Sequence, residues 1–131
     1  MDAGDFAAAR DQLAALLPVR ERVSGPEDPG TLRVRNGLAW WTGHAGDAAG
    51  ARDQFAALLP IFERVFGAEH PEPLRVRNDL AWWTGHAGDA TAARDQLAVL
   101  VPVRERVSGP ENPGTLPARD DLTYWTGQAR S

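Results

Sequence analysis

Large apolar residues recur at helical spacing near the start of the chain. Strong helix formers, mostly Ala, Arg, Gln and Leu, fill the positions between them. Asp5 can cap the first turn and Gly25 can end the helix. The pattern therefore predicts a helix over residues 5–24 with one apolar stripe. The stripe consists of Phe6, Ala9, Leu13, Leu16, Leu17 and Val23.

The same pattern continues along the chain and predicts six helices and no strand. Proline follows a capping residue at Asp28-Pro29, His70-Pro71 and Asn112-Pro113, as is typical of a helix start. Gly43 is expected to end the second helix near Thr42. The connections are short, so successive helices must run antiparallel as hairpins. The expected helices are residues 5–24, 29–42, 47–66, 71–84, 89–108 and 113–127.

Three prolines stand deep inside predicted helices, at Pro18, Pro60 and Pro102. An interior proline removes an amide donor and its ring collides with the preceding turn. Because the proline recurs at equivalent positions, we expect a built-in bend in each helix. The alternative is that each long helix is split into two shorter ones.

One stretch, LAWWTGHAGD, occurs at residues 38–47 and again, letter for letter, at residues 80–89. A looser copy, LTYWTGQA, lies at residues 122–129. Gly4, Gly46 and Gly88 begin equivalent segments, which gives a period of 42 residues. A period of this length is typical of a solenoid, whose units bury their apolar faces against their neighbours.

Composition narrows the choice of function. The chain has 131 residues, 43% of them hydrophobic, and a formal net charge of −4 without a long run of either sign. This balance argues against binding to nucleic acid or to an anionic membrane. Cys is absent, which excludes disulfides and thiolate chemistry. The acidic start does not resemble a secretory signal and no apolar run is long enough to cross a membrane, so a cytoplasmic location is expected.

Candidate catalytic and metal-binding residues are few. Nucleophile-elbow, phosphate-loop and zinc-protease motifs are absent, so we expect neither an enzyme nor a cofactor. His44 and His86 are the main candidates for metal binding, but they lie one repeat apart. Two helix-packing distances of about 8–10 Å separate such positions, too far for both to ligate one ion at about 2.1 Å. We therefore expect no metal site.

The repeat resembles the tetratricopeptide repeat, in the long-period form found in kinesin light chains and in many actinobacterial regulators. The resemblance rests on Leu38-Ala39, Gly46, Ala51, Phe55 and Leu58, and on their copies Leu80-Ala81, Gly88, Ala93, Leu97 and Leu100. It implies an all-α, right-handed solenoid of helical hairpins that works by protein–protein interaction. Residues 1–131 would form a single domain. The units would be a half repeat at 4–25, full repeats at 29–67 and 71–109, and a half repeat at 113–128.

The same resemblance implies a concave groove lined by the first helix of each unit. The groove would bind a peptide or partner segment, with Asn36 and Asn78 bonding its backbone. Arg33 and Arg75 would favour an acidic residue or a C-terminus. The implied contacts are Arg33, Asn36, Trp40, His44, Arg75, Asn78, Asp79, Trp82, His86, Asp120 and Tyr124. Gly37, Pro117, Asp121 and Gln128 fall on the same surface.

Adjacent tryptophans cannot share one helix face, because neighbours lie about 100 degrees apart. We expect Trp41, Trp83 and Trp125 to belong to the core. Trp40 and Trp82 either face the groove or pack between helices.

The two ends of the array keep the apolar pattern of the internal copies. Self-association through these ends is therefore the alternative function, and a homo-oligomer the expected state. A head-to-tail contact would give a ring or a filament, with a two-fold dimer as the competing outcome. Alternatively, the chain is an excised piece or a designed protein, and its apolar ends result from where it was cut. The residues concerned are Phe6, Leu13, Leu17, Leu122 and Trp125.

Overall fold

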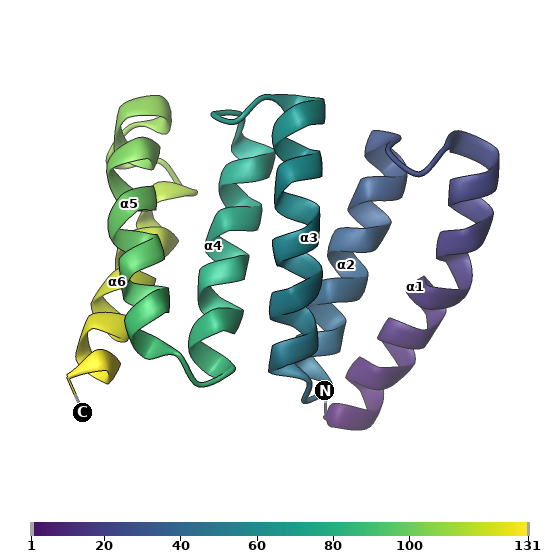
Figure 1. Ribbon diagram of the computed structural model, residues 1–131, viewed down its shortest axis with the longest axis horizontal. Coiled ribbons are helices and arrows are strands. Elements are labelled where there is room, and N and C mark those ends of the chain that lie inside the picture. Colours follow the sequence, from purple (N-terminus) through teal and green to yellow (C-terminus); the bar gives the residue numbers. More distant parts are fainter. Residues whose placement is uncertain (1, 131) are drawn as a thin grey trace.

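A computed structural model describes residues 2–130, which form six helices in an elongated row of antiparallel hairpins (Figure 1). The helices are α1 (Ala3–Ser24), α2 (Pro29–His44), α3 (Ala48–Phe66), α4 (Pro71–His86), α5 (Ala90–Ser108) and α6 (Thr115–Ala129). Each helix packs against the next, and α4 also contacts α2 and α6. No strand occurs between residues 2 and 130, so the predicted all-α solenoid of hairpins is confirmed. None of the described helices is both long and apolar enough to span a membrane.

Helix α1 is capped by Asp2. The backbone N–H of Asp5 donates to Asp2 Oδ1 at 3.1 Å, and the backbone N–H of Asp2 donates to Asp5 Oδ2 at 3.2 Å. This reciprocal pair is a capping box, which satisfies two otherwise unpaired amides. The prediction of Asp5 as the N-cap is therefore wrong, because Asp5 occupies the third helical position. Asp28 and His70 cap α2 and α4 as predicted.

Helix α6 begins at Thr115, two residues later than predicted. Asn112 Oδ1 accepts from the Gly114 N–H at 2.8 Å, and the Asn112 carbonyl accepts from the Thr115 N–H at 2.9 Å. The chain therefore makes a tight turn at Pro113 and Gly114 before the helix starts. The prediction of Asn112 as the N-cap is therefore wrong, because Gly114 holds that position and no side chain caps the helix.

The prediction that Gly43 ends the second helix is wrong. Helix α2 continues to His44, and the left-handed position that follows it is Gly46, with φ 108°. A Cβ atom added at Gly43 would lie closer than 3 Å to the Trp83 ring. Gly43 therefore serves to let α4 approach α2, and Gly85 has the same relation to Trp125 on α6.

Each long helix continues through its internal proline. Pro18, Pro60 and Pro102 lie inside α1, α3 and α5, and all three are exposed. This continuity excludes the alternative of six short helices in place of three long ones.

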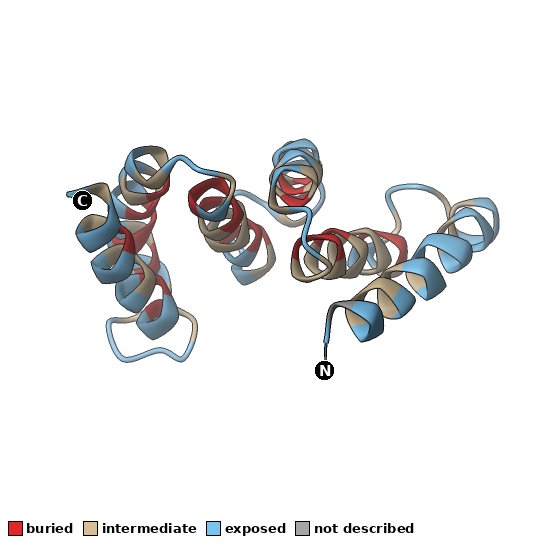
Figure 2. Ribbon diagram, turned by 90° about the horizontal axis from the view of Figure 1, so that it is seen from below, coloured by how far each residue is buried: buried red, intermediate tan, exposed pale blue. Residues whose placement is uncertain are grey.

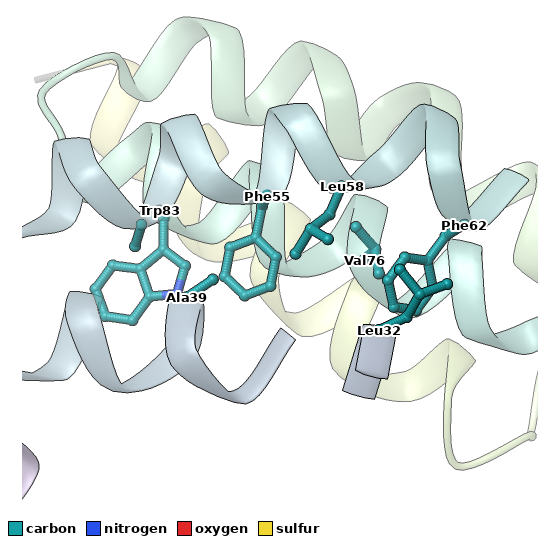
Figure 3. Packing of buried hydrophobic residues seen from close by; sticks show 8 residues of the cluster. Leu32, Ala39, Phe55, Leu58, Phe62, Val76 and Trp83 are labelled. Carbon is teal, nitrogen blue, oxygen red and sulfur yellow. The ribbon is translucent and has the colours of Figure 1, made fainter. Parts of the chain in front are cut away.

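The core follows the middle of the row. Phe55, Leu58 and Phe62 on α3 are at most 2% exposed and pack against Leu32 of α2 and Val76 of α4 (Figure 3). An equivalent cluster around Leu97 and Leu100 joins α4, α5 and α6. Burial of one such side chain stabilises the fold by about 1.5–3 kcal/mol, so these clusters fix the spacing of the helices.

Helix α1 takes no part in this buried core. Figure 2 shows buried residues on α2 to α6 but none among the residues of α1 whose burial is described. Leu16 of α1 is 41% exposed, whereas its equivalents Leu58 and Leu100 are 2% and 1% exposed. The repeats therefore share a sequence pattern but differ in how well their apolar residues are covered.

Candidate functional site

The residues predicted to contact a partner lie on α2, α4 and α6, which are neighbours in space. We call the surface that these three helices form the α2–α4–α6 face. Its helices start at equivalent proline-containing turns and end one turn after their tryptophans. The 42-residue period therefore places equivalent side chains in rows across the face.

A pocket of about 280 Å³ opens on this face, and all three helices line it. Four of its lining residues were predicted contacts, namely Trp40, Asn78, Asp79 and Trp82. Two more come from α6, Pro117 and Asp121. The sequence placed these two on the face without singling them out. Their spacing of one helical turn from each other, in register with Arg75 and Asp79, is the signal that identifies them.

Asn78 and Asp121 connect α4 to α6 across the pocket. The Asn78 amide Nδ2 donates to Asp121 Oδ2 at 2.9 Å. Asn78 Oδ1 is buried and accepts no hydrogen bond from any described residue. One of the side chains that line the pocket therefore has an acceptor that the chain itself leaves without a donor.

Both aspartates in the pocket hold their protons more tightly than usual. Burial raises the pKa of Asp79 to about 7, although the Arg75 charge lowers it and the Asp121 charge adds to the rise. Burial also raises the pKa of Asp121, with the Asn78 hydrogen bond acting in the opposite direction. Ionised carboxylates are costly in such surroundings, so a positive partner would be favoured there.

Aromatic and histidine side chains form a continuous row beside the pocket. Trp40 lies 4.5 Å from His44 between ring centroids, and Trp82 lies 4.4 Å from His86. Trp83 contacts both histidines, at 5.1 Å and 5.7 Å. Burial lowers the pKa of His44 and of His86, which keeps both rings neutral near pH 7.

Trp40 and Trp82 combine the two roles that the sequence left open. Both are half-buried against the core clusters, and both line the pocket. Trp83 and Trp125 are core residues as predicted, at 5% and 4% exposed. Trp41 is only half-buried, stacked on Phe6 at 5.5 Å, so its assignment to the core was too strong.

Arg33 and Arg75 lie outside the pocket and share one carboxylate. The Arg75 Nη2 atom is 3.0 Å from Glu72, and the Arg33 Nη2 atom is 3.8 Å from it. Both arginine side chains are more than half exposed. Asn36 Oδ1 is buried and has no hydrogen-bond donor among residues 2–130. Glu72 was not identified from the sequence.

The remaining predicted contacts lie at the margins of the face. Tyr124 is 45% exposed and packs 5.8 Å from Trp82. Asp120 is exposed and does not line the pocket. His44 and His86 belong to the aromatic row. Among the described residues, no group of three His, Cys, Asp or Glu side chains could hold a metal ion.

The residues predicted for self-association fall at the two ends of the row. Phe6, Leu13 and Leu17 on α1 are half-buried, as is Leu122 on α6. Trp125 is 4% exposed and packs on Gly85 of α4, so it belongs to the core and is not available for contact with a second copy. Solvent reaches other large apolar side chains there, namely Leu16, Val19 and Val23 on α1, at 41%, 42% and 73% exposed, and Leu116 and Tyr124 on α6, at 43% and 45% exposed.

Two further hollows of about 250 Å³ are equivalent to each other by the repeat. One is lined by Leu17, Arg35, Leu38, Gln54, Ala57 and Leu58, and the other by Leu59, Arg77, Leu80, Gln96 and Val99. Because they recur at the same positions, they reflect the packing of successive hairpins. The pocket on the α2–α4–α6 face differs from them in its charge.

Two family models, both described as tetratricopeptide repeat, match residues 1–62 and residues 74–114. The chain belongs to the tetratricopeptide repeat family. Tetratricopeptide repeats are generally protein–protein interaction modules and non-enzymatic scaffolds. The fold and the family predicted from the sequence are therefore confirmed.

Solved structures of tetratricopeptide repeats have the same arrangement. The nearly identical TPR-like repeats of a kinesin-light-chain-like protein from Podosopora anserina superpose with a TM-score of 0.84 at 21% identity. The match covers 97% of this chain and 62% of that one. A variant of the same protein gives the same score and identity, with 61% of its chain covered. This chain thus spans about three fifths of either protein, and the likeness concerns the fold. No curated protein matches the sequence.

Proposed function

We propose that this tetratricopeptide repeat chain is a scaffold that binds an extended segment of a partner protein along the α2–α4–α6 face. The observation that carries the proposal is the pocket to which three successive repeats each contribute side chains. A segment laid across the face would cross the three helices in turn. It would place one side chain in the pocket, where shape and charge select it.

Buried acceptors along the face support this proposal. Asn36 Oδ1 and Asn78 Oδ1 are both buried without a donor among residues 2–130. Buried polar atoms in native proteins nearly always have hydrogen-bond partners. Backbone N–H groups of a bound segment would supply the missing donors at two places one repeat apart.

Arg33 and Arg75 define a second zone on the same face, near the helix starts. Each guanidinium group is exposed, and both lie near Glu72. An acidic residue or C-terminus of the partner would compete with Glu72 for the two arginines. This zone would orient the segment, because exposed ion pairs contribute more to register than to affinity.

Peptides selected from a random library on the folded chain would test the proposal. Their affinity can be measured by fluorescence polarisation against Asn78→Ala and Trp40→Ala. We expect each substitution to weaken binding by about tenfold or more, as at a binding hot spot. Val99→Ala is the matched control, since Val99 is 61% exposed and lines a hollow outside the face. Unchanged binding to both pocket variants, with loss in the control, would contradict the proposal.

Self-association is a second candidate function, and the register of two ion pairs favours it. Arg64 pairs with Glu27, and Arg106 pairs with Glu69, exactly one period later. The next positions in this series are Glu111 near one end of the row and Arg22 near the other. Neither Arg22 nor Glu111 forms an ion pair within residues 2–130. We propose that Glu111 of one copy pairs with Arg22 of a second copy stacked on it.

The apolar residues at the ends support the same arrangement. Leu116 is 43% exposed, while its equivalent Leu74 is fully buried against the next hairpin. Leu16 is exposed at the opposite end, as described above. Stacking copies in the repeat register would cover both residues, and the apolar burial would supply most of the driving force.

Charge reversal separates this arrangement from a two-fold dimer. Arg22→Glu and Glu111→Arg should each weaken self-association, by about tenfold if an attractive pair becomes repulsive. A mixture of the two variants should associate as well as the original chain, because each mismatched end then meets its complement. Sedimentation velocity over roughly 5–500 µM, the concentration range in which such associations are measured, would follow the single variants and their mixture. A strict monomer over this range, or no recovery in the mixture, would overturn the arrangement.

A further inference from the structure

The pocket on the α2–α4–α6 face presents hydrogen-bond acceptors and no basic group. Its six lining residues include Asp79, Asp121 and Asn78, and none of them is Arg, Lys or His. Asn78 uses its amide N–H toward Asp121 at 2.9 Å, which leaves Asn78 Oδ1 buried without a donor. A ligand that fits the pocket must therefore bring donors.

Aromatic walls add a second preference for positive charge. Trp40 and Trp82 line the pocket, and the π face of an indole attracts a cation within about 6 Å. The rings are held in place by His44, His86 and Tyr124. Because burial lowers the pKa of both histidines, they contribute no opposing charge near pH 7.

Comparison of successive repeats shows what the pocket lacks. Asp79 has Arg75 one helical turn before it, and the Arg75 charge lowers the Asp79 pKa. The equivalent position before Asp121 is Pro117, which carries neither charge nor donor. Asp121 receives only the Asn78 amide and the weak influence of His86, against the unfavourable charge of Asp120. The basic group that the repeat supplies to one aspartate is missing for the other.

We propose that this pocket receives the guanidinium group of an arginine side chain from the bound partner segment. The proposal rests on the partner-binding function proposed above and specifies the residue type at its centre. A guanidinium is flat enough to stack on an indole and has five N–H donors for two carboxylates and one amide oxygen. The volume of about 280 Å³ suits a single side chain better than a cofactor.

Other occupants fit less well. A lysine ammonium offers a point charge with three donors and cannot stack on the tryptophans. An acidic side chain or a C-terminal carboxylate would meet two aspartates. Small quaternary ammonium ions suit aromatic walls but offer no donor to Asn78 Oδ1.

Four matched heptapeptides, Ser-Gly-Ser-X-Ser-Gly-Ser with blocked ends, would test the proposal directly. The residue X is arginine, citrulline, lysine or glutamate, and citrulline is the uncharged analogue of arginine. Binding is followed by the indole N–H resonances of Trp40 and Trp82 in ¹⁵N-labelled chain. We expect the arginine peptide to bind at least about fivefold more tightly than each of the others. Equal binding of the citrulline peptide, or tighter binding of the lysine or glutamate peptide, would overturn the proposal.

Single charge removals locate the site. Asp79→Asn and Asp121→Asn should each weaken the arginine peptide by about fivefold or more, because each removes a charged acceptor. Asp120→Asn is the matched control, with the same change of charge on an exposed neighbour that does not line the pocket. A change below about twofold is expected there. If the three variants behave alike, the effect is long-range charge and the proposed site is wrong.

The pH dependence gives an independent readout. Asp79 has a pKa of about 7 in the free chain, so only about one tenth of it is ionised at pH 6. Arginine binding should therefore strengthen from pH 6 to pH 8, and this change should be smaller in Asp79→Asn. Arg75, Asp121 and His86 also face this region, and all three are present in Asp79→Asn as well, so the comparison isolates Asp79. A flat profile in the original chain would contradict a role for Asp79.

These results are separable from the fate of the scaffold proposal. Library-selected peptides that contain no arginine, yet lose affinity in Trp40→Ala, would support binding on the face and exclude the arginine pocket. Peptides that bind equally well to Trp40→Ala and Asn78→Ala would remove both proposals.

Discussion

At the scale of single residues, the face carries side chains that a purely structural repeat does not need. Asp79 stands where the preceding repeat has Gly37, and it is half-buried near a second carboxylate, that of Asp121. Burial of a carboxylate disfavours its ionised form and has to be offset elsewhere in the fold. A residue that costs stability at neutral pH is more easily explained by binding than by packing.

The cost of Asp79 can be measured through pH. Its pKa rises from 3.8 to about 7 on folding, so folding takes up a proton between these values. Stability from this group is present at low pH and is lost as the pH rises from about 4 through 7, by up to about 1.4 kcal/mol per pH unit. We predict that Asp79→Asn unfolds at a higher urea concentration than the original chain at pH 8, with a smaller difference at pH 4.

His44 and His86 change the stability with pH in the opposite direction to Asp79. The effect of Asp79 must therefore be read from the difference between the original chain and Asp79→Asn. The pKa values of the histidines are lowered on folding, so their contribution is lost as the pH falls below about 6.5. Both histidines are present in the original chain and in Asp79→Asn, and so cancel in the difference. If the free energies of unfolding of the two proteins differ by the same amount at every pH, ionised Asp79 does not destabilise the fold.

At the scale of elements, the spacing of α2, α4 and α6 depends on one glycine in α2 and one in α4. Gly43 and Gly85 let Trp83 and Trp125 of the next helix lie directly on the backbone. Contact between helices at this distance is possible only without a Cβ atom. The glycine that recurs in the repeat therefore determines the distance between helices, in addition to being part of a helix.

We predict that Gly85→Ala destabilises the chain by about 1–3 kcal/mol, as overpacking of a core does. The added Cβ atom would lie closer than 3 Å to the Trp125 ring, which is 4% exposed and cannot move outward freely. Gly127→Ala is the control, because it is the equivalent helical position and a Cβ atom there meets nothing within 4 Å. Alanine should be neutral or stabilising at that position, since glycine costs about 0.5–1 kcal/mol in a helix. Thermal unfolding of both variants decides this, and equal midpoints would remove the packing argument.

The sequence predicted every helix because the apolar period and the proline-containing starts agree. It did not predict the details that depend on neighbours in space. The pattern predicts a helix end at Gly43 because glycine usually has that role. In the structure, Gly43 lies inside α2 and makes room for the Trp83 ring. Asp5 was misplaced because Asp2 is the residue that caps α1. The start of α6 was misplaced because the Asn112 side chain closes a turn before the helix and does not cap it.

The candidate site was predictable in part. The repeat placed Trp40, Asn78, Asp79 and Trp82 on one face, and these four line the pocket. The hollow itself depends on Pro117 lacking a long side chain and on Asn78 turning toward Asp121. Such features follow from contacts between helices 42 residues apart and leave no periodic signal. The preference of Arg33 and Arg75 for acidic groups stays a prediction.

At the scale of the whole molecule, stability is distributed unevenly along the row. In repeat arrays each unit is stabilised by its neighbours, and terminal units depend on one contact only. Helix α3 packs against α2 and α4, whereas α1 contacts only α2 among the described elements. The largest fully buried side chains, Phe55 and Phe62, lie on α3. The row should therefore open from its ends while its centre stays folded.

Hydrogen exchange at two protein concentrations would test this uneven stability together with self-association. At 10 µM, roughly a concentration at which weak association is absent, amides of α1 should exchange at least about tenfold faster than those of α3. If copies stack end to end, a hundredfold higher concentration, about 1 mM, should slow exchange in α1 and α6 and leave α3 unchanged. Arg22→Glu should reduce this concentration dependence without altering exchange in the dilute sample, because Arg22 has no ion pair within residues 2–130. Uniform exchange across all six helices would contradict the picture of an array stabilised from its centre.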